Sequence, residues 1–386
     1  MSRAPRLYEY VGAGMAGWGR VAHRTVGLGL DRLRLEPGIV HVCAHLSDDD
    51  VPVVAGALYS GRHLWRNAEP TRPYFAVRND LLLPGFLAGY PPGLPIALRR
   101  ALFGLDIGHV MQSRVRCIPV RFSDRLRLIE ALRARPEVVL AGALSAARVD
   151  AFRRRAARLQ RPEPVTARDV LDGGYADLLW ELVSPDELGG PTWETMWGEH
   201  MAQSGLEVRR LIRLVRGGGS LVLFPHGFPS PDGGIGALDP RVGRLLHHVR
   251  PVAIQPLGLA YDPLVRGRPR AFVASAPTLE RPPRDGGERI VLDALRRATP
   301  LTCGLVVAHE VVAHGRVPSA TIVRAAVDRA LARADDEGRP VEPALAGRGT
   351  RDARVLEAIE AAHRLGPSNR LVQRSARTLA AAWEAA

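Results

Sequence analysis

The stretch of residues 38–58, GIVHVCAHLSDDDVPVVAGAL, constrains the fold of this chain more than any other. The apolar run at residues 39–44 is typical of a buried strand, and a second apolar run begins at Val51. Between them lie His45 and three aspartates, which we expect in a loop just past the strand end. An imidazole near a carboxylate suits a general base, because the carboxylate fixes its tautomer and stabilises its charged form. We therefore expect the chemistry at this loop.

Length and composition predict a large globular protein of the cytoplasm. The 386 residues suffice for one large domain with additions or for two domains. No apolar run reaches the roughly 18–20 residues that a membrane span needs. Arg, Asp and Glu interrupt residues 1–34, so we expect no signal peptide. The cysteines Cys43, Cys117 and Cys303 lie far apart, which favours a reducing compartment.

The formal net charge of +13 raises the question of a nucleic-acid partner. The chain contains no lysine, so all of its basic side chains are arginines, a pattern typical of a GC-rich genome. The arginines are spread along the chain, and only residues 153–155 form a run. We therefore expect no nucleic-acid role and favour attraction to anionic lipid headgroups or phosphorylated substrates.

Strand-like and helix-like patterns alternate through residues 38–280. We expect strands at 39–44, 74–78, 115–122, 220–224, 251–260 and 271–276, and helices at 51–63, 123–135, 147–159 and 208–215. This alternation predicts an α/β fold with a mixed, largely parallel sheet flanked by helices. Residues 136–203 interrupt the alternation, so we interpret them as an insertion or cap in a domain of residues 38–280.

Both ends of the chain are expected to be helical. Apolar residues spaced by three or four within residues 6–35 predict an amphipathic helix in an N-terminal segment of residues 1–37. That helix either packs on the domain or rests on lipid with Trp18 near the headgroups. Residues 281–386 are expected to form a helical C-terminal extension, with helices at 290–297, 301–313, 321–334, 351–365 and 371–383.

A second unusual loop, FPHGFPS, covers residues 224–230 after a glycine-terminated helix and an apolar strand. Gly227 permits a tight backbone turn, and the free N–H groups of such a turn can face an anion. Taken alone, the same letters also describe an ordinary surface turn.

The two loops together resemble motifs of the glycerolipid acyltransferase family. That family has Asn-His, four residues and Asp, where residues 44–50 read AHLSDDD, and Phe-Pro-Glu-Gly-Thr-Arg-Ser, where residues 224–230 read FPHGFPS. Residues 249–254, VRPVAI, resemble its last block, and YFAVRNDLL and IPVR at residues 74–82 and 118–121 resemble segments between the first and third blocks. The resemblance covers residues 38–280.

The resemblance implies a cytoplasmic O-acyltransferase that works at the membrane surface. His45 would be the general base and Asp50 would orient it. Phe224, Pro225, His226 and Gly227 would help to bind the polar head of the acceptor. The acyl donor would be a thioester of coenzyme A or of acyl carrier protein, and the acceptor would be similar to glycerol 3-phosphate or lysophosphatidic acid. No bound cofactor or metal is implied.

Three of the departures from the family pattern bear on the chemistry. Ala44 replaces the Asn, His226 replaces the Glu and Pro229 replaces the Arg. An arginine can hold a phosphate with two hydrogen bonds, and a proline cannot. Either Arg78 or Arg121 binds the phosphate, or the acceptor differs, or the chain is a catalytically inactive lipid-binding homologue.

A zinc-dependent deacetylase is the alternative enzyme class. Deacetylases of the N-acetylglucosaminyl-phosphatidylinositol type have Ala-His-Pro-Asp-Asp-Glu after a strand, and His45, Asp48 and Asp49 resemble that set of ligands. Here, however, two residues separate His45 from Asp48 where that family has one, and the Glu is missing. This alternative also leaves the loop at residues 224–230 unexplained.

Overall fold

The computed structural model describes every residue except 1–5, 35, 48, 61–71, 90–93, 122–124, 185–186, 189–190, 228, 231, 249–252, 281–285 and 385–386. The chain forms two compact units. Unit 1 joins Met1–Phe75 to Ile212–Ala386, and unit 2 is Ala76–Leu211. The 136–203 segment, expected from the sequence as an insertion, lies within unit 2.

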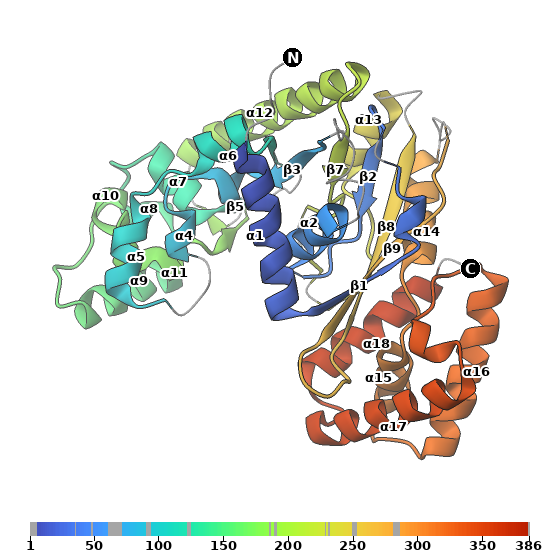
Figure 1. Cartoon of the computed structure of the whole chain (residues 1–386). Coiled ribbons are helices and arrows are strands. Elements are labelled where there is room, and N and C mark those ends of the chain that lie inside the picture. Colours follow the sequence, from blue (N-terminus) through green and yellow to red (C-terminus); the bar gives the residue numbers. More distant parts are fainter. Residues whose placement is uncertain are drawn as a thin grey trace. The chain divides into compact units, whose positions relative to one another are not determined.

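A mixed, mostly parallel sheet forms the centre of unit 1, as the sequence predicts (Figure 1). The strands are β1 (Arg24–Leu28), β2 (Val40–Cys43), β3 (Tyr74–Arg78), β7 (Leu221–Leu223), β8 (Ile254–Asp262) and β9 (Arg270–Ser275). They follow the order β1-β9-β8-β2-β7-β3. Strand β4 (Cys117–Val120) belongs to unit 2. The pairs β1–β9, β2–β7, β2–β8 and β3–β7 are parallel, and the pair β8–β9 is antiparallel. Val40 to Cys43 of β2 are completely buried, which explains why the strand is apolar except for His41.

Helices surround this sheet. The helices of unit 1 are α1 (Arg6–Ala22), α2 (Asp50–Ser60), α13 (Pro240–His248), α14 (Gly287–Ala298), α15 (Cys303–His314), α16 (Ala320–Asp336), α17 (Arg348–Leu365) and α18 (Arg370–Trp383), with 3-10 turns η1 (Leu30–Arg32) and η5 (Pro343–Leu345). The last five helices confirm the expected helical C-terminal region. Its apolar side chains share one core with Ala260, Leu264 and Phe272 of the β8–β9 region, so these helices belong to the same packed body as the sheet.

Unit 2 is built mainly from short helices around its own core, which includes Phe152, Tyr175 and Leu179. They are α4 (Phe86–Gly89), α5 (Ile96–Phe103), α6 (Gly108–Arg114), α7 (Leu128–Ala134), α8 (Leu140–Ala143), α9 (Ala146–Arg158), α10 (Ala167–Val170) and α11 (Ala176–Leu179), with 3-10 turns η2 (Asn79–Leu82) and η3 (Gly173–Tyr175). A two-stranded pair joins β5 (Leu126–Arg127) to β6 (Leu182–Val183). Helix α12 (Pro191–Arg216) runs from this unit into unit 1.

The N-terminal segment corrects one expectation. The predicted helix over residues 6–35 ends at Ala22, and Arg24–Leu28 form the edge strand β1 beside β9. The β-branched residues Thr25 and Val26 favour a strand over a continued helix. Helix α1 packs closely on α2, because a Cβ added at Gly56 would lie 3.1 Å from the Cα of Ala16. Within the described ranges, no helix combines the length and the apolar character needed to cross a membrane.

Candidate functional site

The loop after β2 places His45 and Asp50 together, as the sequence predicts. Strand β2 ends at Cys43, and Asp50 is the first residue of α2. The Oδ2 atom of Asp50 accepts hydrogen bonds from the backbone N–H groups of Leu46 and Ser47, the latter at 2.8 Å. These bonds close the loop, because the carboxylate at the helix start holds the chain that leads into it.

The imidazole of His45 lies against this carboxylate. Its Nδ1 is 2.9 Å from Oδ2 of Asp50, and the two residues are 8% and 0% exposed. On the other side of the carboxylate, Oδ1 accepts a 2.6 Å hydrogen bond from the hydroxyl of Tyr261 at the end of β8. With Nδ1–H directed at Asp50, the lone pair of His45 lies on Nε2. Within the described part of the chain no group bonds this Nε2, so it is free to take a proton.

The second loop reaches the same histidine. Phe224, which follows β7, packs its ring at 4.9 Å from the His45 ring, measured between centroids. Gly227 turns the chain back with a φ of 75°, a conformation that a side chain would disfavour. The backbone N–H of Ser230 then donates a 2.9 Å hydrogen bond to the carbonyl of His45. The carbonyl of Pro225 anchors the far side of the loop by accepting from the N–H of Asp239 at 3.0 Å.

His226, which stands where the resembling family has Glu, is a neutral group. Burial, together with the nearby charge of His45, lowers the pKa of His226 to about 4. Its Nε2 lies 3.2 Å from the carbonyl oxygen of Gly236, a contact that needs the proton on Nε2. Its Nδ1 is enclosed and has no partner within the described residues, which leaves a buried hydrogen-bond acceptor. Phe224 and Ser230, on either side of His226 in this loop, both contact His45, so the loop that carries His226 borders the same site.

Arg374, which no sequence pattern indicated, joins the two loops. Arg374 of α18 donates from Nη2 to the carbonyl of Leu46 in the first loop and, at 3.2 Å, to the carbonyl of Ser230 in the second. It comes from a helix 328 residues further along the chain. Tyr261 was also missed, although a tyrosine at the end of a strand beside β2 is a signal that could have suggested it.

A second histidine–aspartate pair lies behind the first. Asp49 accepts from His23 of the α1–β1 junction at 3.0 Å and from the indole N–H of Trp18 at 3.4 Å. The hydrogen bond from His23 lowers the pKa of Asp49, although burial opposes it. The rings of His23 and Tyr261 are 5.1 Å apart, so both histidine–aspartate pairs touch the same tyrosine.

The two arginines expected to bind phosphate, Arg78 and Arg121, both contribute to ion pairs in unit 2. Arg78 contacts Asp80 at 3.1 Å, and Arg121 contacts Glu207. Burial raises the pKa of Glu207 to about 7 and Arg121 opposes that rise. Phe224 contacts His45, and Pro225, His226 and Gly227 follow it in the same loop, whereas the two arginines have carboxylate partners of their own.

Some residues of the expected sites lie outside the part of the chain that the structure describes. Asp48, a proposed zinc ligand of the deacetylase alternative, and Phe228, next to Gly227, lie outside the described residues, as do four residues of the 249–254 block. Asp49 faces His23 and Trp18. Across the described ranges, no three or more His, Cys, Asp or Glu side chains are grouped to hold a metal ion.

Comparisons with known proteins include a remote likeness to a solved structure. No protein-family model and no curated protein matches the chain. Among solved structures, the chain is similar to the 1-acyl-sn-glycerophosphate (LPA) acyltransferase PlsC from Thermotoga maritima, with 12% identity and a TM-score of 0.32, over 75% of this chain and 81% of that one. A likeness this remote carries no inference about the present chain.

Proposed function

We propose that this protein is an O-acyltransferase that moves an acyl group from a thioester to a hydroxyl of a glycerolipid-type acceptor. The observation that supports the proposal is the His45–Asp50 pair, with Nδ1 engaged at 2.9 Å and Nε2 left open beside the loop of residues 224–227. The carboxylate holds the imidazole in the tautomer that presents a free lone pair, which is what general-base catalysis at a hydroxyl requires.

In the proposed reaction, Nε2 of His45 removes the proton from the acceptor hydroxyl as its oxygen attacks the carbonyl carbon of the thioester. The carbon–sulfur bond of the resulting tetrahedral intermediate then breaks, and the thiolate leaves with the proton that His45 carries. Asp50 stabilises the imidazolium between these two proton transfers. Its own charge stays satisfied by Tyr261 and by two backbone N–H groups, so the carboxylate need not move.

The second loop supports a role in acceptor binding. The loop turns at Gly227 and packs Phe224 on His45, and His226 lies between these two residues as a neutral ring. The enclosed Nδ1 of His226 accepts hydrogen bonds, so we propose that it receives one from a second hydroxyl of the acceptor. A glutamate there would be anionic, and the change predicts an acceptor other than the usual phosphorylated glycerol.

The donor and the location belong to the same proposal. We propose that the thioester is that of coenzyme A or of acyl carrier protein, and that the protein works at a membrane surface without crossing it. Helix α1 presents Tyr10, Trp18 and Val21 to solvent with exposed fractions of 70%, 55% and 67%. An aromatic and aliphatic face of this kind suits the interface of a lipid bilayer.

The decisive variant is His45→Ala, assayed by release of free thiol from palmitoyl-CoA in the presence of glycerol 3-phosphate, lysophosphatidic acid or monoacylglycerol. We expect a loss of about 10²- to 10⁴-fold in kcat, the usual contribution of a general base. The matched control is His363→Ala, which removes an exposed histidine of α17 and should leave the rate unchanged.

Three results would contradict the proposal. Thiol release that persists in His45→Ala would remove the histidine from the reaction. Lipid binding by the unmodified protein without thiol release from any donor, including acyl carrier protein thioesters, would identify an inactive homologue. Deacetylation lost on treatment with a chelator would favour the zinc enzyme.

A further inference from the structure

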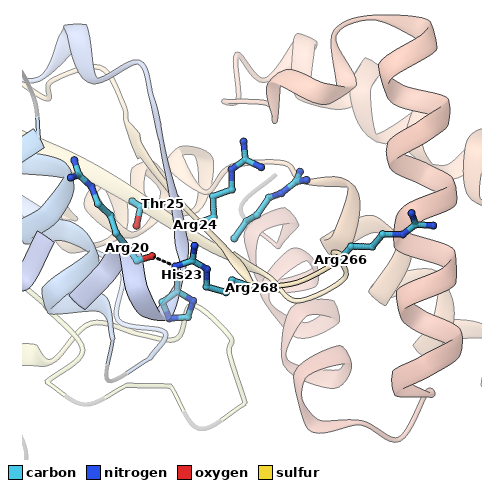
Figure 2. A pocket seen from close by; sticks show the side chains of 7 residues that line it. Arg20, His23, Arg24, Thr25, Arg266 and Arg268 are labelled. Carbon is cyan, nitrogen blue, oxygen red and sulfur yellow. Dashed lines mark hydrogen bonds between the residues drawn. The ribbon is translucent and has the colours of Figure 1, made fainter. Parts of the chain in front are cut away.

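A basic cavity lies in unit 1, where α1 ends and β1 begins (Figure 2). Its volume is about 250 Å³, and five arginines line it: Arg20, Arg24, Arg266, Arg268 and Arg270. His23 and Thr25 complete the lining, which contains no carboxylate. A cavity of this size is smaller than a typical site for a drug-sized molecule and suits a compact polar group.

The strand pairing explains why the arginines gather here. Arg24 of β1 is the ladder partner of Arg270 of β9, so two positive side chains begin on neighbouring strands. The connection between β8 and β9 adds Arg266 and Arg268 around Gly267, which turns the chain with a φ of 84°. Like charges on paired strands repel each other, so this arrangement is unfavourable unless something negative joins it.

The chain's own acids balance only some of these charges. Arg266 pairs with Glu360, and Arg270 pairs with Glu342 at 2.8 Å. Arg268 donates instead to the backbone carbonyl of Arg20 at 2.7 Å, at the end of α1 (Figure 2). For Arg24 and Arg268, no carboxylate partner exists among the residues that the structure describes. The cavity therefore carries positive charge that the described protein leaves uncompensated.

The residues around the cavity indicate which kind of molecule carries the anion that it binds. Trp18 and Val21, on the last turns of α1, are 55% and 67% exposed, and Arg268 also approaches the carbonyl of Val21 at 3.5 Å. Exposed apolar side chains beside unpaired arginines are the combination with which peripheral proteins hold anionic membranes, because the apolar groups enter the interface while guanidinium groups bind phosphate.

We propose that this cavity binds the phosphate group of an anionic phospholipid, with Arg24 and Arg268 as the main ligands and with Trp18 and Val21 resting in the bilayer interface. A phosphate monoester suits the site best, because its two negative charges match the two unbalanced arginines and guanidinium groups bind phosphate in pairs of hydrogen bonds. The site uses none of His45, Asp50 or His226, and binding can be measured without turnover. A failure here would therefore leave the proposed acyl transfer untouched.

The test is co-sedimentation of the full chain with vesicles. Phosphatidylcholine vesicles that contain phosphatidic acid are compared with vesicles of equal total charge that contain phosphatidylglycerol instead. The phosphate of phosphatidylglycerol is a diester. We expect preference for phosphatidic acid, and we expect Arg24→Gln with Arg268→Gln to weaken that binding at least tenfold. Arg329→Gln replaces an exposed arginine of α16 that does not line the cavity; it removes one positive charge, as each of these two substitutions does, and should change binding less than twofold.

A second arm separates the lipid from a soluble phosphate. Val21→Ser should weaken vesicle binding about threefold, because it removes apolar contact with the interface. It should leave the binding of glycerol 3-phosphate, measured by calorimetry, unchanged. Soluble phosphate binding that needs Arg24, without any vesicle binding, would overturn the lipid part of the proposal.

The cavity itself is tested by Arg24→Gln alone. The side chain of Arg24 is exposed and has no partner among the described residues, so this single variant should fold normally, as circular dichroism and the melting temperature can verify. Equal phosphate binding by Arg24→Gln and by the parent protein, or an equal loss in Arg329→Gln, would overturn the cavity as a phosphate site.

Discussion

Two buried polar centres lie at the end of β8, one on each side of the strand. Tyr261 donates to Asp50 in the His45 centre, and its neighbour Asp262 pairs with Arg354 of α17. Successive residues of a strand point to opposite faces, so one strand end supplies both centres. Asp50 and Asp262 are both 0% exposed. Burial and charge therefore do not distinguish the two centres.

The two centres differ in whether a side-chain atom is left without a hydrogen-bond partner. The guanidinium of Arg354 bonds Asp262, Glu342 at 3.0 Å, Glu357 at 3.1 Å and the carbonyl of Leu264 at 2.8 Å. Burial opposes its charge, but the surrounding carboxylates outweigh that effect and raise the pKa of Arg354. The centre is closed and ties α17 to the sheet.

In the His45 centre, Asp50 is equally well satisfied, yet Nε2 of His45 stays open. The comparison teaches that a free reactive atom, more than burial or an ion pair, marks the candidate for catalysis. Variants of the two centres should accordingly separate stability from activity.

The largest effect is expected from Arg354→Met, which breaks the closed centre. Asp262 would remain buried without its cation and Glu342 would keep only Arg270, so we expect a loss of about 3–5 kcal/mol in the free energy of unfolding. Urea denaturation measures it, and Arg364→Met, an exposed arginine on the same helix, is the control and should cost less than about 1 kcal/mol. A small loss in Arg354→Met would make this centre dispensable and would weaken the comparison.

The second prediction contrasts His45 with His41, four residues earlier on β2. His41 is completely buried, and neither ring nitrogen has a partner among the described residues. Burial lowers the pKa of His41 to about 4, from 6.5 in the unfolded chain. Between these values the unfolded state binds a proton that the native state does not, so stability falls as the pH drops from about 6.5 to about 4.

Between pH 6.5 and pH 4, protonation of His41 in the unfolded state costs up to about 3 kcal/mol of the free energy of unfolding, and replacing His41 with Leu should remove this cost. Urea unfolding at pH 4.5 and pH 7.5 compares the variant with the parent protein. Some dependence of the free energy of unfolding on pH should remain, because the pKa of His226 is lowered to about 4 as well. An unchanged slope in His41→Leu would mean that His41 is protonated, or paired, in the native state.

The smallest effect is expected from Arg374→Gln, which loosens the two loops of the open centre. The Leu46 and Ser230 carbonyls would lose their shared donor, and we expect kcat to fall about tenfold with little change in KM, because His45 and Asp50 remain but are held less firmly. The assay is thiol release from palmitoyl-CoA, with the melting temperature as a check on folding.

Arg377→Gln is the matched control for this variant. It lies one turn further along α18, where its guanidinium contacts the exposed acids Asp232 and Glu384. It should keep the full rate. Equal losses in the two variants would assign the effect to the packing of α18 as a whole. They would contradict a specific role of Arg374 in holding the two loops.

Several elements could be predicted from local patterns alone. The run of apolar residues before His45 predicts β2, because only a strand buried on both faces needs such a run. The pairing of His45 with Asp50 follows from their spacing around a helix start. The helix predicted over residues 6–35 was wrong beyond Ala22, because apolar residues at the edge strand β1 coincide with helical spacing.

The sequence by itself determined the α/β class, the loop that carries His45 and Asp50, and the helices of the C-terminal region, since each depends on the order of neighbouring residues. Only the tertiary structure decided which distant side chains complete the two centres. Tyr261 and Arg374 reach the first from 211 and 328 residues away, and Arg354 closes the second from 92 residues away. Hydrogen bonds of this kind depend on how the helices pack against the sheet, and no local pattern records that packing.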